Sequence, residues 1–190
     1  MRTKYIFIII FIIMGCSMNT VNYDTNSTLE KLYKINDFTN NFEVPIHLSD
    51  SEIYREMVRE PELYFSAFYE ILKMNDVPDS VKGITGYVAV HSELKIYMEF
   101  VNNSIELWMK NKINDQVLSD ISFPGPPWLT KIVYNYKKRE VLETYKRISE
   151  LPCLSGEVKN IAIRVITGEQ KKSTKVYMDA YPEMNNYWGK

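Results

Sequence analysis

The chain has 190 residues, 45% of them hydrophobic, and its 23 basic and 24 acidic residues give a formal net charge of −1. This length suits about one domain that can bury a core without disulfides or metals. The charge is dispersed and slightly acidic, so the chain lacks the basic patch that binds nucleic acid, and we expect no nucleic-acid partner.

The first residues have the pattern of a secretory signal. Two basic residues precede the apolar run 5–14 (YIFIIIFIIM), which as a helix rises only about 15 Å, half of a hydrocarbon core. The run ends in Ile13-Met14-Gly15-Cys16, and this tetrapeptide resembles the lipobox of bacterial lipoproteins. The resemblance implies diacylglycerol transfer to Cys16, cleavage after Gly15 and acylation of the new amino group. An uncleaved signal anchor is the alternative.

Processing at this site has consequences for the rest of the chain. Loss of residues 1–15, which carry two basic residues and no acidic one, changes the net charge from −1 to −3. Lipid on Cys16 leaves Cys153 as the remaining cysteine, which excludes an internal disulfide. We expect Cys153 to be a buried, unreactive thiol, with intermolecular pairing as the alternative. Ser17 rather than Asp after the cysteine resembles lipoproteins of the outer membrane that face the periplasm.

The mature chain divides into two parts. Residues 16–44 comprise the lipidated cysteine, a polar tether over 17–28 and a transitional segment that can add a short helix or strap. Residues 45–190 are predicted to form a single helical domain.

Apolar residues at helical spacing follow in chain order. Ser49 and Glu52 have capping-box spacing and predict a helix that Glu60-Pro61 ends or restarts. Further helices are expected over 62–74, from Asp79 or Ser80 onward, over 94–112, through 129–136 and 142–151, over 158–166 and over 169–181. Gly168 is expected to stop the helix before it, and the β-rich stretch 161–167 is a strand in the alternative interpretation.

Two stretches 77 residues apart resemble each other. Val81-Lys82-x-Ile84 and Val158-Lys159-x-Ile161 each follow a helix end and a turn that contains proline. This pattern resembles the antiparallel helix pairs of HEAT-type repeats, although the expected middle copy fits poorly at Leu129-x-x-Ile132. We therefore predict an all-α fold of antiparallel helix pairs, either a short HEAT-like solenoid or an irregular helical bundle. Gly83 and Gly86 would permit two helices to approach closely.

The sequence offers little for catalysis. The two histidines, His47 and His91, have no metal-ligand spacing, and glycine-rich cofactor loops and nucleophile motifs are absent, so we expect neither metal nor cofactor. His91 is expected to be a hydrogen-bonded structural imidazole. Glu99 and Glu106 share a helix face, and paired carboxylates could act on a sugar, but acids at this spacing are typical of a solvated helix face.

Binding is the function that the sequence favours. The irregular stretch from Phe123 to Trp128 holds two aromatic residues between three prolines, and the tail ends in Tyr187 and Trp188. These four side chains are candidates for protein interaction, although Trp128 can equally pack into the core. The prediction is a non-enzymatic, lipid-anchored binding protein of the cell envelope, of the immunity type that neutralises a periplasmic toxin. A scaffold or pilotin-like subunit of an envelope assembly and a peptidoglycan-active enzyme are the alternatives.

Overall fold

The computed structural model describes residues 23–40, 48–125 and 131–180. All regular elements among them are helices, which confirms the all-α class. The α-helices are α1 (Thr25–Asn40), α2 (Glu52–Met57), α3 (Phe65–Lys73), α4 (Asp79–Ala89), α5 (Leu94–Met109), α6 (Asp115–Ser122), α8 (Arg139–Glu150), α9 (Gly156–Ile166) and α10 (Glu169–Ala180), with single 3-10 turns at Leu48–Asp50, Pro61–Tyr64 and Val133–Asn135.

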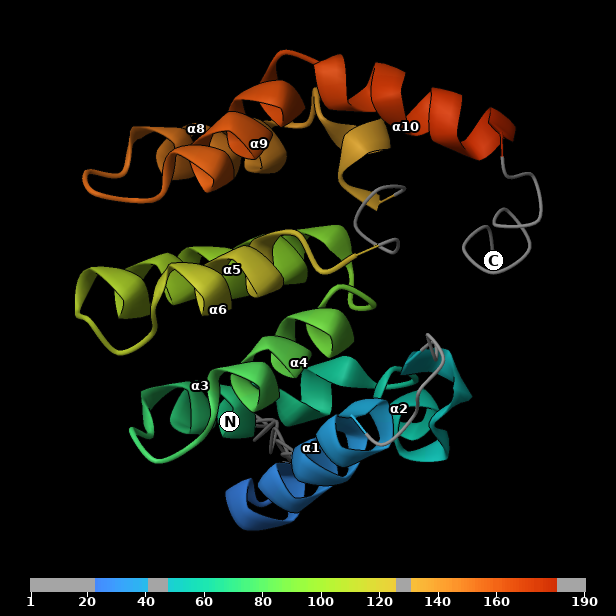
Figure 1. The fold of residues 1–190 in the computed structure, drawn as a ribbon, viewed down its shortest axis with the longest axis vertical. Coiled ribbons are helices and arrows are strands. Elements are labelled where there is room, and N and C mark those ends of the chain that lie inside the picture. Colours follow the sequence, from blue (N-terminus) through green and yellow to red (C-terminus); the bar gives the residue numbers. More distant parts are fainter. Residues whose placement is uncertain (1–22, 41–47, 126–130, 181–190) are drawn as a thin grey trace, which may run out of the picture.

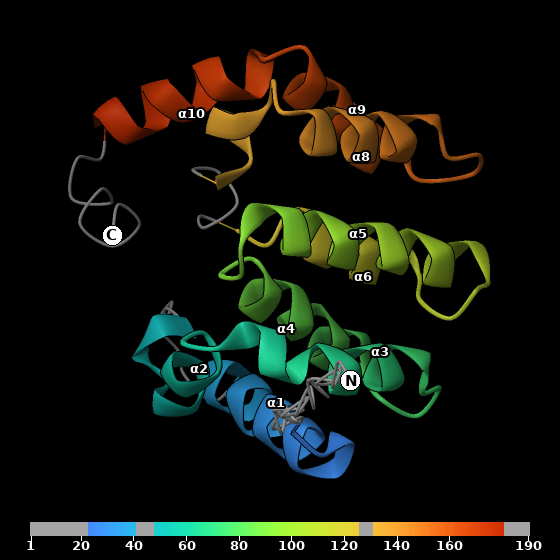
Figure 2. The same cartoon turned by 180° about the vertical axis from the view of Figure 1, so that it is seen from behind.

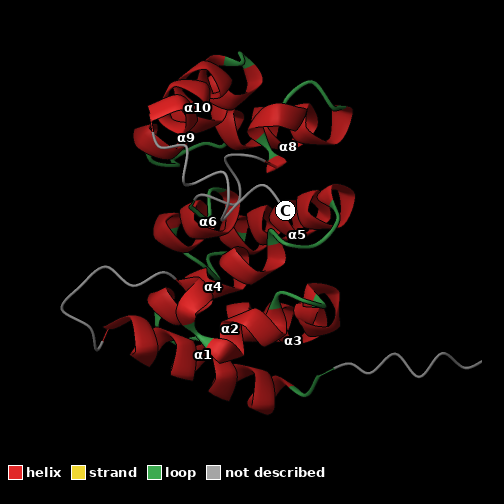
Figure 3. Cartoon of the chain, turned by 90° about the vertical axis from the view of Figure 1, so that its right-hand side faces the viewer, coloured by secondary structure: helices red, strands yellow, loops and turns green. Residues whose placement is uncertain are grey.

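The helices form three stacked antiparallel pairs, α3/α4, α5/α6 and α8/α9 (Figure 1). Helix α5 packs between α3 and α8, and α4 packs on α6. Figure 3 shows α3, α5 and α8 on one side of the stack and α4, α6 and α9 on the other. Helix α1 covers one end by packing on α3 and α4, while α10 packs on α9 at the other end (Figure 2). The antiparallel helix pairs predicted from the sequence are therefore present.

The middle copy of the repeat lies in α6 rather than at Leu129. Val117 stands 36 residues after Val81 and 41 before Val158, and each valine is the third residue of its helix. All three valines are buried. The repeat of 77 residues is thus two unequal steps, because the connection from α6 to α8 is longer than the connection from α4 to α5.

Two glycines hold α4 against α6 at close range, as the sequence predicted. A methyl group built on Gly86 would lie 2.5 Å from Ile121 Cα and 2.7 Å from the Asp120 carbonyl oxygen. On Gly83 it would lie 2.7 Å from Asp120 Oδ2. At Gly86 the obstructing atoms are backbone, so a residue without a Cβ is needed there, and this glycine sets the close approach of α4 in the first helix pair to α6 in the second.

Aromatic side chains fill the interface between α3 and α5. Tyr64 and Phe68 are fully buried, whereas Phe65 and Tyr69 lie half-buried on the side of α3 that faces α5. Their rings pack on Phe100 with centroid distances of 5.0 and 5.3 Å. Phe100 thus joins the first helices of two successive pairs.

The N-terminal elements differ from the sequence prediction in two places. Helix α1 begins at Thr25, so the predicted tether over 17–28 is wrong at its end; Leu32 and Ile35 are fully buried in the common core. Helix α2 is capped by Ser51 rather than by Ser49, since the Ser51 hydroxyl accepts the Tyr54 N–H at 3.3 Å. Residues 48–50 instead form a 3-10 turn.

Two further helix termini were assigned by sequence. Neither Asp79 nor Ser80 caps α4, because Pro78 occupies the N-cap position and no side chain accepts a hydrogen bond there. Gly168 ends the helix before it as predicted, with a positive φ of 77°. Residues 156–166 form helix α9, so the strand interpretation of 161–167 is wrong.

Candidate functional site

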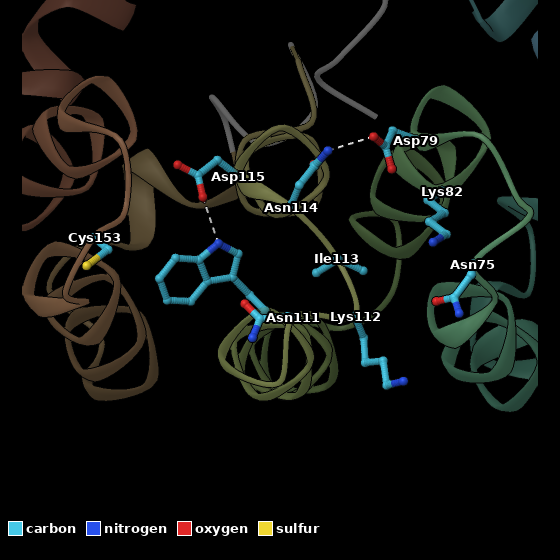
Figure 4. A pocket seen from close by; sticks show the side chains of 10 residues that line it. Asn75, Asp79, Lys82, Asn111, Lys112, Ile113, Asn114, Asp115 and Cys153 are labelled. Carbon is cyan, nitrogen blue, oxygen red and sulfur yellow. Dashed lines mark hydrogen bonds between the residues drawn. The ribbon is translucent and has the colours of Figure 1, made fainter.

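The turns within the three helix pairs lie along one edge of the stack, at the left of Figure 1. A pocket with a volume of about 520 Å³ opens along this edge (Figure 4). It reaches from the start of α4, across the α5–α6 turn, to the α8–α9 turn. Its lining is polar apart from an indole, an isoleucine and a thiol: Asn75, Asp79, Lys82, Trp108, Asn111, Lys112, Ile113, Asn114, Asp115 and Cys153. We call it the turn-edge pocket.

Hydrogen bonds between the layers brace the turn-edge pocket. Asp115 accepts the Trp108 indole N–H at 2.8 Å and, through its other oxygen, the Ser155 backbone N–H at 2.9 Å. Asn114 donates to Asp79 Oδ2 at 2.6 Å (Figure 4). These three bonds link the first residues of α6 to α5, to the α8–α9 turn and to α4, so the pocket walls are held in fixed relative positions.

Lys82 is the unusual residue of the pocket. Its side chain is 4% exposed, and Figure 4 shows it directed from α4 toward the pocket. Among the described residues, no hydrogen bond or ion pair is made by its ammonium group, although Asp79 precedes it by one helical turn. The stem of this lysine is thus buried, while its ammonium is not among the fully buried polar atoms and reaches the water of the pocket.

Cys153 lies at the opposite end of the pocket and corrects a prediction. The residue is exposed and its thiol is free, whereas the sequence reasoning expected a buried thiol. Its φ of 62° is left-handed, and this turn conformation directs Leu151 and Leu154 inward while Pro152 and Cys153 face outward.

Phe123 is the one predicted interaction residue within the described part of the chain. It is half-buried and its ring lies 5.5 Å from that of Tyr145, so it packs on the core at the end of α6. Cys16, Trp128, Tyr187 and Trp188 lie outside the described residues. Phe123 is not among the described residues that line the turn-edge pocket.

His91 is bonded as expected, but it is not on a buried stripe. It follows the end of α4, is exposed overall, and places Nε2 3.1 Å from the Tyr54 hydroxyl, which donates to the Tyr87 carbonyl at 3.0 Å. Burial of the bonded side of the ring and the nearby Lys131 ammonium lower the pKa of His91 to about 4. Another side of the residue is exposed, and water there offsets part of the cost of charging the ring.

The Lys131 ammonium near His91 is held at the C-terminal end of α4. Its ammonium donates to the carbonyl oxygens of Val90, at 2.5 Å, and Ser92, both just beyond α4. A cation at this position satisfies carbonyl groups that have no partner within the helix, and it complements the negative end of the helix dipole. His47, the other histidine, lies outside the described residues.

The two acids considered for sugar chemistry have different surroundings. Glu106 forms an ion pair with Arg147 of α8, whose guanidinium also donates to Asn102 Oδ1 at 3.4 Å. Glu99 is exposed and lines a smaller hollow of about 380 Å³ between α5 and α8. Glu106 thus joins two helix pairs. Within the described ranges, no group of three His, Cys, Asp or Glu side chains is arranged to hold a metal ion.

Sequence reasoning missed the residues that build the turn-edge pocket. Asn114 and Asp115 begin a helix that the apolar spacing does not reveal. The available signal was Asn114 three residues before a buried valine, the spacing of an N-cap; its side chain accepts the Val117 N–H at 2.9 Å.

No protein-family model, curated protein or solved structure matches the chain. Of the helices in the described ranges, none is both long and apolar enough to cross a bilayer.

Proposed function

We propose that the protein is a lipid-anchored, non-enzymatic binding protein of the cell envelope and that its ligand is another protein. The observation that carries this proposal is the turn-edge pocket, a polar hollow built from all three helix pairs and braced by hydrogen bonds between them. A rigid stack of helices offers a surface that needs little ordering when a partner binds.

The anchor in this proposal rests on the lipobox-like sequence Ile13-Met14-Gly15-Cys16. Diacylglycerol on Cys16 would hold the helical body beside a membrane, and residues 17–24 would connect the two. A flexible stretch of eight residues reaches about 15 Å. With Ser17 after the cysteine, we place the protein at the outer membrane, facing the periplasm.

Among binding proteins of this kind, we propose an immunity role in which the protein neutralises a periplasmic toxin. Immunity proteins need a firm, preorganised surface and no catalytic groups of their own, and the braced pocket suits that requirement. A subunit of an envelope assembly is the competing function, and it differs in the identity of the partner.

Affinity capture with residues 17–190, followed by a toxicity assay, tests this proposal. The expected result is one secreted toxin among the captured proteins, with cells protected from that toxin when the full chain is present. Recovery of a secretion or assembly subunit would replace immunity with scaffolding. Hydrolysis of peptidoglycan by the fragment, lost on Glu99→Gln, would contradict the non-enzymatic proposal altogether.

A further inference from the structure

We infer that the turn-edge pocket binds the carboxylate of an aspartate or glutamate side chain from the protein partner, with Lys82 as its ion-pair partner. This inference rests on the proposed function, because it names the group of the partner that the pocket receives. It is carried by the ammonium of the buried Lys82 side chain, which has no partner among the described residues, and by the N-termini of the two helices that begin at the pocket.

The position of Lys82 favours an anion. Helix α4 is packed against α1, α3 and α6, so the lysine stem is enclosed by the core while the ammonium faces the pocket (Figure 4). The nearby Asp79 carboxylate receives a hydrogen bond from Asn114 instead. A carboxylate entering the pocket would supply the charge and the acceptor atoms that Lys82 lacks among the described residues.

The helix ends around the pocket add to this preference. Helices α4 and α6 both begin at the pocket, and a helix N-terminus carries a partial positive charge of about half a unit. No side chain caps α4, so no side-chain acceptor occupies its first-turn N–H groups. An anion at this position is favoured by the dipole as well as by Lys82.

The charges of the pocket favour a carboxylate over a phosphate. Lys82 and Lys112 are balanced by Asp79 and Asp115, so the lining is formally neutral. Both oxygens of Asp115 accept hydrogen bonds, from Trp108 and Ser155, which hold this carboxylate in place on the α6 side of the pocket. A single negative charge can pair with the Lys82 ammonium. A dianion would be repelled more strongly by the Asp79 and Asp115 carboxylates.

The volume and rim of the pocket suit a side chain that projects from a protein surface. A volume of about 520 Å³ exceeds what a small anion fills and accommodates a glutamate with its neighbouring backbone. Asn75 and Asn111 are exposed at the rim, where their amides can bond to that backbone. A free anion would leave these amides unused.

The test uses the full chain in a mild non-ionic detergent, with ¹⁵N-labelled tryptophan. The indole N–H of Trp108 reports on the pocket, and Trp108→Phe assigns its resonance. The probes are two blocked peptides, acetyl-Gly-Glu-Gly-amide and acetyl-Gly-Gln-Gly-amide, together with sodium glutarate and inorganic phosphate. The glutamine peptide matches the glutamate peptide in shape and lacks its charge.

We expect the glutamate peptide to shift the Trp108 resonance to saturation and the glutamine peptide to bind at least tenfold more weakly. Lys82→Met should lower the affinity for the glutamate peptide at least tenfold, whereas Lys159→Met should leave that affinity unchanged. Lys159 is the matched control because it follows Val158 as Lys82 follows Val81 and does not line the pocket. The far-ultraviolet circular dichroism of each variant shows whether it has folded.

Charge reversal at the exposed Lys112 provides a second variant that leaves the core intact. Lys112→Glu should lower the affinity for the glutamate peptide about threefold and leave the affinity for the glutamine peptide unchanged. Equal binding of the two peptides by the unaltered chain would overturn the inference without any variant. Tighter binding of glutarate or phosphate than of the glutamate peptide would overturn it as well, by assigning the pocket to a small anion.

The outcome for the pocket is distinguishable from that for the proposed function. If the captured partner protein binds the Lys82→Met variant as well as the unaltered chain, the carboxylate inference is wrong and the binding function stands. If no partner protein is captured while the peptide discrimination holds, the pocket is an anion site and the proposed function fails.

Discussion

Gly86→Ala changes the most tightly constrained contact between two layers of the stack. The added methyl group would lie 2.5 Å from Ile121 Cα and 2.7 Å from the Asp120 carbonyl oxygen. Both are backbone atoms of α6, so no side-chain rotation can relieve the overlap, and α4 and α6 must move apart.

The magnitude follows from two opposing effects. Overpacking a well-filled core costs about 1–3 kcal/mol, and we take the upper end because the obstructing atoms are backbone. Replacing glycine by alanine within a helix stabilises the helix by about 1 kcal/mol, because alanine has the higher helix propensity. The net destabilisation is therefore about 2 kcal/mol, which lowers the urea midpoint by about 1 M if the slope is about 2 kcal/mol per molar.

Two other glycines serve as graded controls. Gly83→Ala meets Asp120 Oδ2 at 2.7 Å, the end of a side chain that can turn away, so a smaller loss is expected. Gly156→Ala meets nothing within 4 Å in the first turn of α9 and should be neutral or slightly stabilising. Urea unfolding followed by circular dichroism at 222 nm measures all three. Stability of Gly86→Ala equal to that of Gly156→Ala would refute the close approach of α4 and α6.

Two more predictions concern single side chains. Because the folded state holds the pKa of His91 below its usual value near 6.5, the stability associated with the neutral imidazole is complete above that pH and is lost as the pH falls toward about 4. With one side of the residue exposed, we expect the free energy of unfolding to fall by about 1 kcal/mol over this pH range, and to fall less in His91→Gln. Identical plots of the free energy of unfolding against pH for the two proteins would contradict this prediction. The exposed Cys153 thiol should react fully with a thiol reagent in the folded chain carrying Cys16→Ser, and reaction only after unfolding would show that it is buried.

The helices with a clear apolar stripe could be predicted from the sequence, and α6 could not. Helix α5 has apolar residues at helical spacing over 16 residues, so its stripe is plain. Helix α6 has eight residues and buries Val117, Leu118 and Ile121, which is too short a pattern to distinguish from a turn. Its existence depends on packing against α4 through Gly86, a contact between distant parts of the chain.

The sequence pattern does not predict the start of α1, for a related reason. Residues 25–28 are polar, and polar composition favours a disordered tether. Yet the Asp24 carboxylate accepts the Ser27 N–H at 3.1 Å, and the helix buries one narrow face that includes Leu32 and Ile35. Burial against α3 and α4 decides the structure of this segment, and composition does not report it.

The candidate site was less predictable than the fold. The sequence singled out aromatic residues in irregular segments, whereas the pocket is lined by residues from three separate turns. Lys82 was noticed only because the dipeptide Val-Lys recurs at Val158-Lys159. Lys82 is buried and Lys159 is half-exposed because different helices surround them. The sequence pattern does not predict which helices these are.

Metabolic labelling with radioactive palmitate tests the anchor on which the proposed location and function depend. The full chain should incorporate label, and mass spectrometry should show that it begins at Cys16 with residues 1–15 removed. Cys16→Ser should abolish both labelling and cleavage before residue 16. Palmitate incorporation that persists in Cys16→Ser would contradict the account.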